Sequence, residues 1–286
     1  MIIDFHAHTS EHNLWGLHTK RADLDELRHY AKIFGIDRIE LMATYFPLKG
    51  TGLPNLLLQE RIKGDKLFGF FGSLDLSDWN CSLAELEMLA EAKAIDGIKG
   101  YAGYQKFKLD SELVWQVCRL AQKYDLPIAV HMGELHPCCP QDKNQKEFRC
   151  HHDSCPLDEL SHLAHPDMLR PLARRFPEVN FIACHLANPY FRELREAMRE
   201  CWNISTDISG QFVSGTDEDT ADYRKKISSE IHRFLEVPNG MDRVLFATDF
   251  PIQSYQDSLD IVRSLHLSAT DEAKILSGNT QRLLKI

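Results

Sequence analysis

The sequence alternates short β-rich runs with longer helical stretches along its whole length. Eight runs are expected to be strands, at residues 2–8, 37–44, 66–75, 96–101, 127–133, 180–186, 203–209 and 243–250. Segments such as 24–35 and 111–125 have the pattern of helices and lie between them. Strands that alternate with helices pair in parallel through right-handed crossovers, and eight such units can close on themselves. We therefore predict an α/β protein with one (β/α)8 TIM-barrel domain over residues 1–286.

An open, doubly wound sheet is the alternative architecture for the same alternation. In such a sheet the first and last strands lie apart. In a barrel all strand ends converge on one site at the C-terminal face. Polar residues at the ends of the first and last runs favour the barrel, because they gain a shared role only there.

The first run, MIIDFHAH, places His6 and His8 two residues apart. Side chains alternate between the two faces of a strand, so these histidines are expected to point the same way and share one ligand. The same alternation puts Asp4 on their face and Phe5 on the opposite face, against helices. A half-exposed edge strand with two incidental histidines is the alternative for this pair taken alone.

Four later runs also end in a residue that can bind or bridge a cation. They end in Lys99, His131, His185 and Asp249. The residues two positions earlier should point inward beneath the site, and they are small: Gly97, Ala129, Ala183 and Ala247. Their neighbours should face the helices instead, and these are Ile98, Val130, Ile182 and Phe246. A single strand-end histidine or aspartate is often structural, but the joint pattern predicts a metal site at the C-terminal ends of the strands.

These motifs occur in a recognisable order along the chain. They are HAH, GIK, AVHMGE, IACHLAN, NISTDISG, ATDFP and the closing KILSGNTQRLLKI. In this order they resemble the amidohydrolase superfamily, specifically its amidohydrolase-related branch of metal-dependent hydrolases and decarboxylases. The resemblance extends from the first strand to the last helix.

The resemblance implies a divalent metal held by His6, His8, His131 and Asp249. It also implies that His185 is either a ligand of a second metal or a catalytic acid/base beside the first. Lys99 matches the position of a carboxylated lysine that bridges two metals in binuclear relatives. Alternatively, a charged Lys99 would hold a substrate carboxylate beside a single metal.

Imidazoles with one carboxylate suit Zn²⁺ best, and Mn²⁺, Fe²⁺ or Co²⁺ are possible substitutes. We expect one or two ions. Such an ion makes hydroxide available near neutral pH and polarises a substrate carbonyl. Asp249 is then the expected general base, which takes a proton from the metal-bound water and passes it to the leaving group.

Other polar residues near strand ends are candidates for substrate contact, although each could equally be structural. They are Trp15, Tyr45, Tyr101, Tyr104, Glu134, Asn188, Asp207 and Ser209. A hydrogen-bonded carboxylate with no substrate contact is an equal alternative for Asp207.

A segment rich in cysteine and histidine, at about residues 136–155, departs from the resemblance and reads as a loop insertion after the fifth strand. Soft ligands at this density suggest a second, structural zinc. The candidate ligands are Cys138, Cys139, Cys150, His151 and Cys155. Their spacing matches no standard zinc finger, so an active-site lid or an intermolecular contact with reduced cysteines is the alternative.

Charge and hydropathy exclude some classes of partner. With 33 Lys+Arg against 42 Asp+Glu and no basic stripe, the chain is not expected to bind nucleic acid. No run approaches the length of a membrane helix, and no signal peptide precedes the first strand. We expect a cytoplasmic protein that acts on a small molecule, as a monomer or a homo-oligomer.

The leading functional prediction is a metal-dependent hydrolase of a C–N, C–O or lactone bond in a small carboxylated or cyclic substrate. The alternative is a metal-dependent, non-oxidative decarboxylase of a small aromatic or enoic acid. A non-catalytic metal-binding scaffold is the weakest alternative, since it has no need of the complete ligand set.

Overall fold

A computed structural model describes residues 1–14, 16–45, 52–76, 78–135 and 158–286 of the chain. Eight strands form one parallel sheet in the order β1 to β8, each hydrogen-bonded to the next. They are β1 (Ile3–Ala7), β2 (Arg38–Met42), β3 (Phe68–Ser73), β4 (Gly97–Gly100), β5 (Ile128–Val130), β6 (Phe181–Ala183), β7 (Ile204–Asp207) and β8 (Val244–Leu245). The predicted insertion at about 136–155 falls between residues 135 and 158, outside the described residues.

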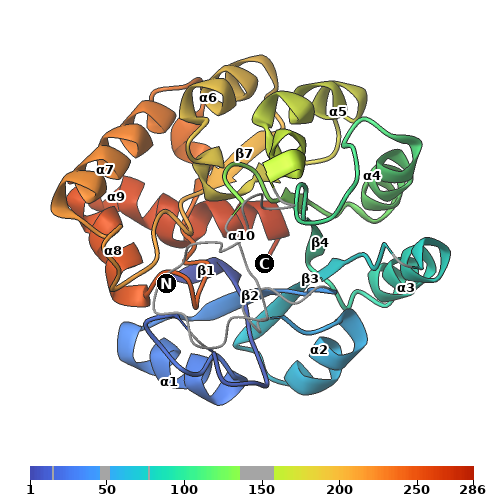
Figure 1. The fold of residues 1–286 in the computed structure, drawn as a ribbon, viewed down its shortest axis with the longest axis horizontal. Coiled ribbons are helices and arrows are strands. Elements are labelled where there is room, and N and C mark those ends of the chain that lie inside the picture. Colours follow the sequence, from blue (N-terminus) through green and yellow to red (C-terminus); the bar gives the residue numbers. More distant parts are fainter. Residues whose placement is uncertain (15, 46–51, 77, 136–157) are drawn as a thin grey trace.

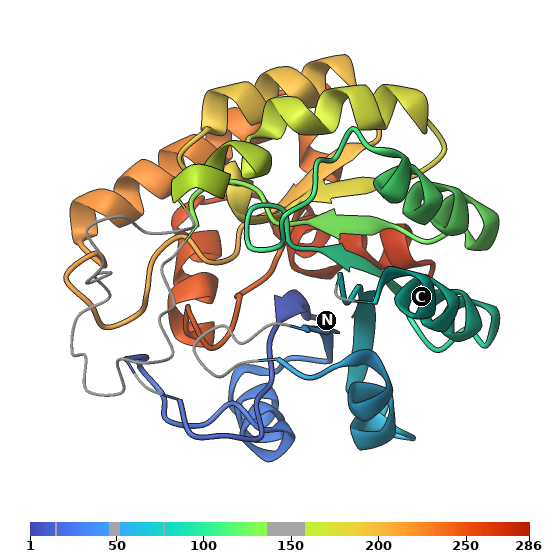
Figure 2. The same cartoon turned by 45° about the vertical axis from the view of Figure 1, so that its right-hand side comes forward.

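Helices surround the strands, as Figures 1 and 2 show from two directions. They are α1 (Leu24–Phe34), α2 (Asn55–Ile62), α3 (Trp79–Glu91), α4 (Glu112–Tyr124), α5 (Leu169–Arg175), α6 (Phe191–Glu200), α7 (Ala221–Leu235), α8 (Tyr255–Ser264), α9 (Ala269–Ala273) and α10 (Asn279–Leu284). Across the described ranges, none of the helices combines the length and apolarity that a bilayer crossing requires.

Backbone hydrogen bonds join the last strand region to the first. Phe5 N donates to Phe246 O at 3.0 Å, Asp249 N to His6 O at 2.8 Å, and His8 N to Phe250 O at 2.7 Å. The predicted barrel is therefore confirmed, and the open sheet is excluded. His6, His8 and Asp249 lie directly on this junction between β1 and β8.

The chain marks its helix ends with local signals. At the start of α1 the Asp23 carboxylate accepts hydrogen bonds from the backbone N–H groups of Asp25 and Glu26. The helix stops at Gly35, whose φ of 68° is the left-handed conformation that glycine adopts without steric cost. Such caps fix where each helix begins and ends, and so where the next strand can start.

A small apolar cluster fills the barrel beneath the site. Its buried members are Phe5, Met42, Phe71, Ala129, Ile182, Cys184, Leu245 and Ala247, and Leu283 and Leu284 near the C-terminus pack against it. Gly97 also faces this cluster, since a Cβ there would lie 2.2 Å from Phe71 Cε1. The prediction of small inward residues is thus correct for Gly97, Ala129 and Ala247.

Two predictions of side-chain direction are wrong, the first in β1. Asp4 pairs with Ile39 and Ala7 with Leu41, so β1 contains one extra residue relative to β2 between these two pairs. This bulge reverses the alternation ahead of His6. Phe5 therefore points into the barrel, and Asp4 accepts hydrogen bonds from Thr248 N and Oγ1, at 3.0 and 2.6 Å.

The second correction concerns β6. Ile182 and Cys184 belong to the interior cluster, whereas Ala183 packs in the larger core between strands and helices. The prediction assumed that strict alternation continues to His185. Instead the chain turns at a short 3₁₀ segment, η3 (Cys184–Ala187), where His185 has a φ of 63°. The turn brings Cys184 and His185 to the same side.

Charged residues lie on the inner face of the barrel below this cluster. Glu40 is two residues before the inward-facing Met42, and it is fully buried. Arg38 donates to Glu40 Oε1 at 2.5 Å and to Asp96 Oδ2 at 2.9 Å. A Cβ on Gly69 would come within 2.4 Å of all three side chains, so glycine makes room for them. Burial and the nearby Asp96 raise the pKa of Glu40 to about 8, although Arg38 opposes the shift.

This raised pKa predicts a pH-dependent stability that Glu40→Gln should remove. Between pH 4.5 and about 8 the folded state holds a proton on Glu40 that the unfolded state has released. The free energy of unfolding should therefore fall as the pH rises through this window, by up to about 1.4 kcal/mol per pH unit. Urea unfolding from pH 5 to 8 should show Glu40→Gln gaining stability relative to the parent as the pH rises. A difference that does not vary with pH would contradict the shift.

Candidate active site

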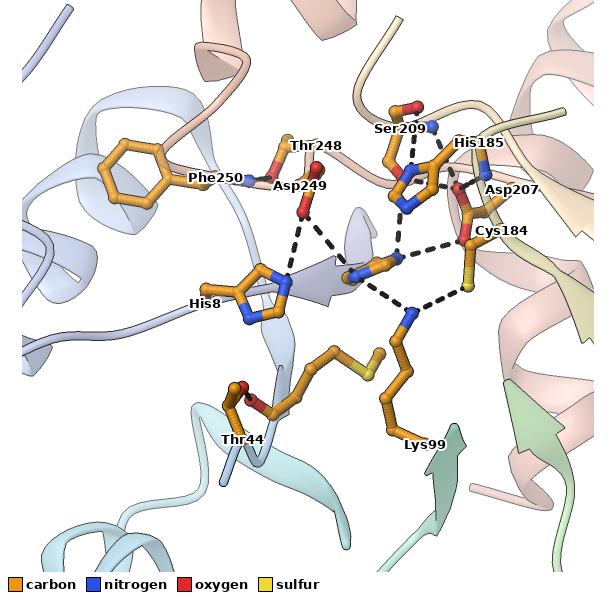
Figure 3. Close-up of polar contacts among 12 residues, drawn as sticks. His8, Thr44, Lys99, Cys184, His185, Asp207, Ser209, Thr248, Asp249 and Phe250 are labelled. Atoms are coloured by element: carbon orange, nitrogen blue, oxygen red, sulfur yellow. Dashed lines mark hydrogen bonds and ion pairs between the residues drawn. The ribbon is translucent and has the colours of Figure 1, made fainter. Parts of the chain in front are cut away.

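His6, His8 and Asp249 converge at the C-terminal end of the barrel. His8 Nε2 lies 3.2 Å from Asp249 Oδ1, and His6 Nε2 lies 3.7 Å from the same oxygen. Figure 3 shows Asp249 above His8 with the dashed contacts that join them. The three residues offer ligand atoms that all lie within 4.8 Å of one another.

These separations fit a bound cation. Ligands at about 2.1 Å from a tetrahedral metal are about 3.4 Å from each other, and the two distances to Asp249 Oδ1 bracket that value. In addition, His8 Nδ1 is buried and has no hydrogen-bond partner. The donor set of two imidazoles and one carboxylate is that of a divalent transition metal.

The protonation states also suit metal binding. Burial and the charge of Lys99 lower the pKa of His6 to about 3, so the imidazole is neutral and has a lone pair. Burial alone would raise the pKa of Asp249. The hydrogen bond with His8 and the neighbouring imidazoles outweigh it, and the pKa of Asp249 lies well below its usual range. The site therefore presents the neutral imidazole of His6 beside the ionised carboxylate of Asp249.

A second group surrounds His6 on its other side. His6, Cys184 and His185 form another set of candidate ligand atoms within 4.8 Å of one another. Lys99 Nζ lies 3.0 Å from Cys184 Sγ and 3.5 Å from His6 Nε2. Sequence reasoning missed Cys184, because strict alternation along β6 directed it toward the helices.

Lys99 is only 1% exposed, so it is buried as deeply as His6 and more deeply than His185. Its ammonium group lies 5.2 Å from the centre of the Tyr101 ring. Among the described residues it forms no ion pair with a carboxylate. The amine is therefore packed into the interior of the barrel.

His131 lies beside His185, with ring centres 4.9 Å apart, and forms a T-shaped contact with Tyr104, with ring centres 4.7 Å apart. His131 Nε2 is 3.1 Å from the carbonyl oxygen of Glu134, an acceptor, so this nitrogen donates and Nδ1 keeps the lone pair. Burial lowers the pKa of both His131 and His185. Two neutral imidazoles thus line the site beside the first group.

Asp207, at the end of β7, lies behind the histidines and is fully buried. Its Oδ2 atom is 3.2 Å from His6 Nδ1. Its Oδ1 atom accepts hydrogen bonds from His185 N at 3.0 Å, Ser209 N at 3.1 Å and Ser209 Oγ at 2.5 Å. Both oxygens are occupied, so of the two alternatives for Asp207 the geometry favours the hydrogen-bonded carboxylate.

Gly210 directly follows Ser209 and has a φ of 60°. A Cβ at this position would lie 2.7 Å from Asp249 Oδ2 and 2.9 Å from His185 Nδ1. Only glycine leaves both side chains in place. The motif STDISG therefore supports the site through a carboxylate, a hydroxyl and an absent side chain.

The remaining candidates for substrate contact lie in different surroundings. Tyr101 is buried, and its hydroxyl donates to the Ala43 carbonyl oxygen at 2.8 Å. Tyr45 Oη donates to Glu85 at 2.6 Å. Asn188 Nδ2 donates to Tyr223 Oη at 2.8 Å, and Glu134 is exposed. Trp15 lies outside the described residues, as do Cys138, Cys139, Cys150, His151 and Cys155.

A family model described as amidohydrolase matches residues 3–286. The chain belongs to the amidohydrolase family. The family contains metal-dependent hydrolases and decarboxylases, and the chain is an enzyme of this kind. No curated protein matches its sequence.

Solved structures resemble this amidohydrolase over nearly its whole length. A probable 2-pyrone-4,6-dicarboxylic acid hydrolase from Acinetobacter baumannii, with citric acid bound, has 13% identity and a TM-score of 0.67, covering 100% of this chain and 99% of its own. The 2,6-dihydroxybenzoate decarboxylase from Rhizobium has 18% identity and a TM-score of 0.66, covering 99% and 98%.

A dihydroxybenzoic acid decarboxylase from a Polaromonas species, with bound manganese and 2-nitroresorcinol, has 18% identity and a TM-score of 0.64, covering 99% of this amidohydrolase and 96% of its own chain. Identities this low show a shared fold alone. Both hydrolysis and decarboxylation are thus named among proteins with this barrel.

Proposed function

We propose that this amidohydrolase hydrolyses a C–N, C–O or lactone bond of a small carboxylated or cyclic substrate, using one divalent metal ion. The observation that carries the proposal is the convergence of His6, His8 and Asp249 at distances that fit a tetrahedral ion. His131 and His185 lie next to them and complete the set of strand-end residues. When bound, the ion supplies a water of lowered pKa and polarises the substrate carbonyl.

Asp249 and His185 carry the proton transfers in this proposal. Asp249 is the most exposed of the group, with 15% of its side chain accessible, so its carboxylate can reach the attacking water. It takes the proton of that water and passes it to the leaving group. His185 is neutral and lies 5.0 Å, ring to ring, from His6, where it can donate or accept a proton beside the reacting bond.

We also propose that Lys99 remains an unmodified amine and that the site holds a single metal. Asp207 and Asp249 bring two negative charges to a region with one ammonium group. One divalent ion then leaves a net charge of +1, and two ions bridged by a carboxylated lysine would leave the same charge. The choice of a single ion therefore rests on the packing of the amine against Cys184 Sγ, at 3.0 Å. A substrate above the histidines has no access to an amine that is 1% exposed, which disfavours the role of Lys99 as a substrate anchor.

Lys99→Met tests this assignment. We expect elemental analysis to find one metal per chain in the parent and in Lys99→Met, because the amine is not a ligand. Bicarbonate during metal loading should not change the activity of the parent. Two ions in the parent and one in the variant would instead identify Lys99 as a carboxylated bridge.

Zinc is the proposed metal, because two or more imidazoles and one carboxylate suit it. The named manganese-bound structure keeps manganese as the first substitute to test. We also propose a cytoplasmic location, which is supported by free thiols at Cys81, Cys118, Cys184 and Cys201 among the described residues. A small molecule is the proposed partner, with no nucleic acid or membrane; a homo-oligomer stays a prediction.

Decarboxylation of a small aromatic acid is the second candidate. It is favoured by the T-shaped contact between Tyr104 and His131, with ring centres 4.7 Å apart, because an aromatic wall suits a planar ring beside the metal. Two of the similar structures named above are decarboxylases of hydroxylated benzoic acids.

A substrate panel separates the two candidates. Metal-loaded protein should be assayed against lactones, amides and aromatic acids, with carbon dioxide measured separately from the hydrolytic products. Hydrolysis without carbon dioxide release supports the leading proposal, and stoichiometric carbon dioxide supports the second. Turnover by metal-free protein would contradict both.

A further inference from the structure

Asp207 contacts the imidazole of His6 directly and the imidazole of His185 through the hydroxyl group of Ser209. It is fully buried and has no surface open to a substrate. Its Oδ1 atom accepts from two backbone N–H groups and from Ser209 Oγ. Its Oδ2 atom is left for His6 Nδ1 at 3.2 Å. We propose that Asp207, together with Ser209, is a positioning residue that fixes both His6 and His185 in the tautomer with hydrogen on Nδ1.

The argument for His6 follows from donor and acceptor roles. An ionised carboxylate only accepts hydrogen bonds, so His6 Nδ1 has to carry the hydrogen. The lone pair of His6 is then on Nε2, the nitrogen that faces Asp249 Oδ1 and Lys99 Nζ. A carboxylate behind a metal-binding imidazole also makes the imidazole a stronger ligand.

The argument for His185 runs through Ser209. The hydroxyl of Ser209 has one hydrogen, and it donates it to Asp207 Oδ1 at 2.5 Å. Toward His185 Nδ1, at 2.9 Å, Ser209 Oγ can therefore only accept. The Ser209 carbonyl oxygen, at 3.3 Å from the same nitrogen, is also an acceptor. His185 Nδ1 thus carries the hydrogen, and the lone pair is on Nε2.

Asp207 also holds the backbone that aims His185. The His185 N–H donates to Asp207 Oδ1 at 3.0 Å at the residue where φ is 63°. Non-glycine residues adopt this left-handed conformation rarely. One carboxylate therefore stabilises the turn, the ring orientation and the tautomer of the same histidine.

Asp207→Asn is the decisive variant, because it keeps the shape of the side chain. Its carbonyl oxygen can still accept from the two N–H groups, which leaves the amide nitrogen as a donor toward His6 Nδ1. His6 should then switch to the tautomer with hydrogen on Nε2. The tautomer is read by long-range ¹H–¹⁵N correlations on metal-free protein labelled with ¹⁵N-histidine, so this test does not depend on any substrate.

We expect the parent to show hydrogen on Nδ1 of both His6 and His185, and Asp207→Asn to show His6 switched. The metal part of the inference rests on the proposed function. For Asp207→Asn, titration with Zn²⁺ against a chelator should show an affinity about 10- to 100-fold lower than that of the parent. This is the usual effect of losing the residue that hydrogen-bonds to a metal ligand. Ser209→Ala should change the signals of His185 and leave the tautomer of His6 as in the parent.

Thr206→Val is the matched control for a lost buried hydrogen bond on the same strand. Thr206 Oγ1 donates to the Ala183 carbonyl oxygen at 2.7 Å and contacts neither imidazole. Thr206→Val should lower the free energy of unfolding and leave the tautomers of His6 and His185 and the metal affinity unchanged. The inference is overturned if His6 keeps hydrogen on Nδ1 in Asp207→Asn. It is also overturned if Thr206→Val weakens metal binding as much as Asp207→Asn does. Failure of zinc to bind the parent, with the tautomers as expected, would overturn the proposed function only.

Discussion

Asp249→Asn is expected to keep most of its metal and to lose turnover by about 100-fold or more, the scale of a lost general base. Asparagine preserves the size of the side chain and one carbonyl oxygen, so it can still lie beside His8 Nε2. It has no site that takes up a proton at neutral pH. Steady-state kinetics and elemental analysis on the same preparation measure the two effects together.

Asp260→Asn is the matched control, since Asp260 lies on α8 and pairs with Arg263 at the surface. It should retain the kcat and the metal content of the parent. An Asp249→Asn protein that keeps both its metal and most of its turnover would show that Asp249 is not the base. Loss of the metal along with turnover would instead make Asp249 essential as a ligand.

His6→Ala and His8→Ala should each lose metal and activity together. Each removes one of the three atoms that converge on the ion, and the remaining two cannot close a tetrahedral set with protein ligands. We expect the affinity for Zn²⁺ to fall by more than about 100-fold, beyond the effect of losing an outer partner. Activity should drop to the background of metal-free protein.

His29→Ala is the control for these variants, because His29 is exposed on α1, outside the site. Circular dichroism should show the barrel intact in all three proteins. Turnover retained by either His6→Ala or His8→Ala at full metal loading would contradict the assigned ligands. Partial activity restored by excess metal would agree with them.

The order and number of the strands could be predicted from the sequence, because each short apolar run lies between amphipathic helices. Closure could be predicted as well, since His8 and Asp249 have a common purpose only if the first and last strands meet. The lengths of the strands could not be predicted. The run at 243–250 yields a strand of two residues, Val244–Leu245, because the chain beyond it bends to present polar side chains.

The finer arrangement of the site depended on local exceptions to strand geometry. The bulge in β1 and the left-handed conformation of His185 both reverse the alternation on which the face of each residue was predicted. Cys184 therefore entered the site unpredicted. Neither exception has a sequence signal such as glycine at the position itself. They are stabilised by tertiary contacts, including the Asp207 carboxylate, which lies far away in the sequence.

The junction of β1 with β8 makes the order of synthesis relevant to metal uptake. Asp249 leaves the ribosome more than 200 residues after His6 and His8. Until β8 has been made, the two histidines can offer only part of a coordination sphere. The metal site is therefore incomplete until β8 has been synthesised. An ion that binds after that point joins β1 to β8. The bound ion would hold β1 against β8 in the folded barrel. Removal of the ion by a chelator should therefore make the β1–β8 junction the first part of the barrel to open.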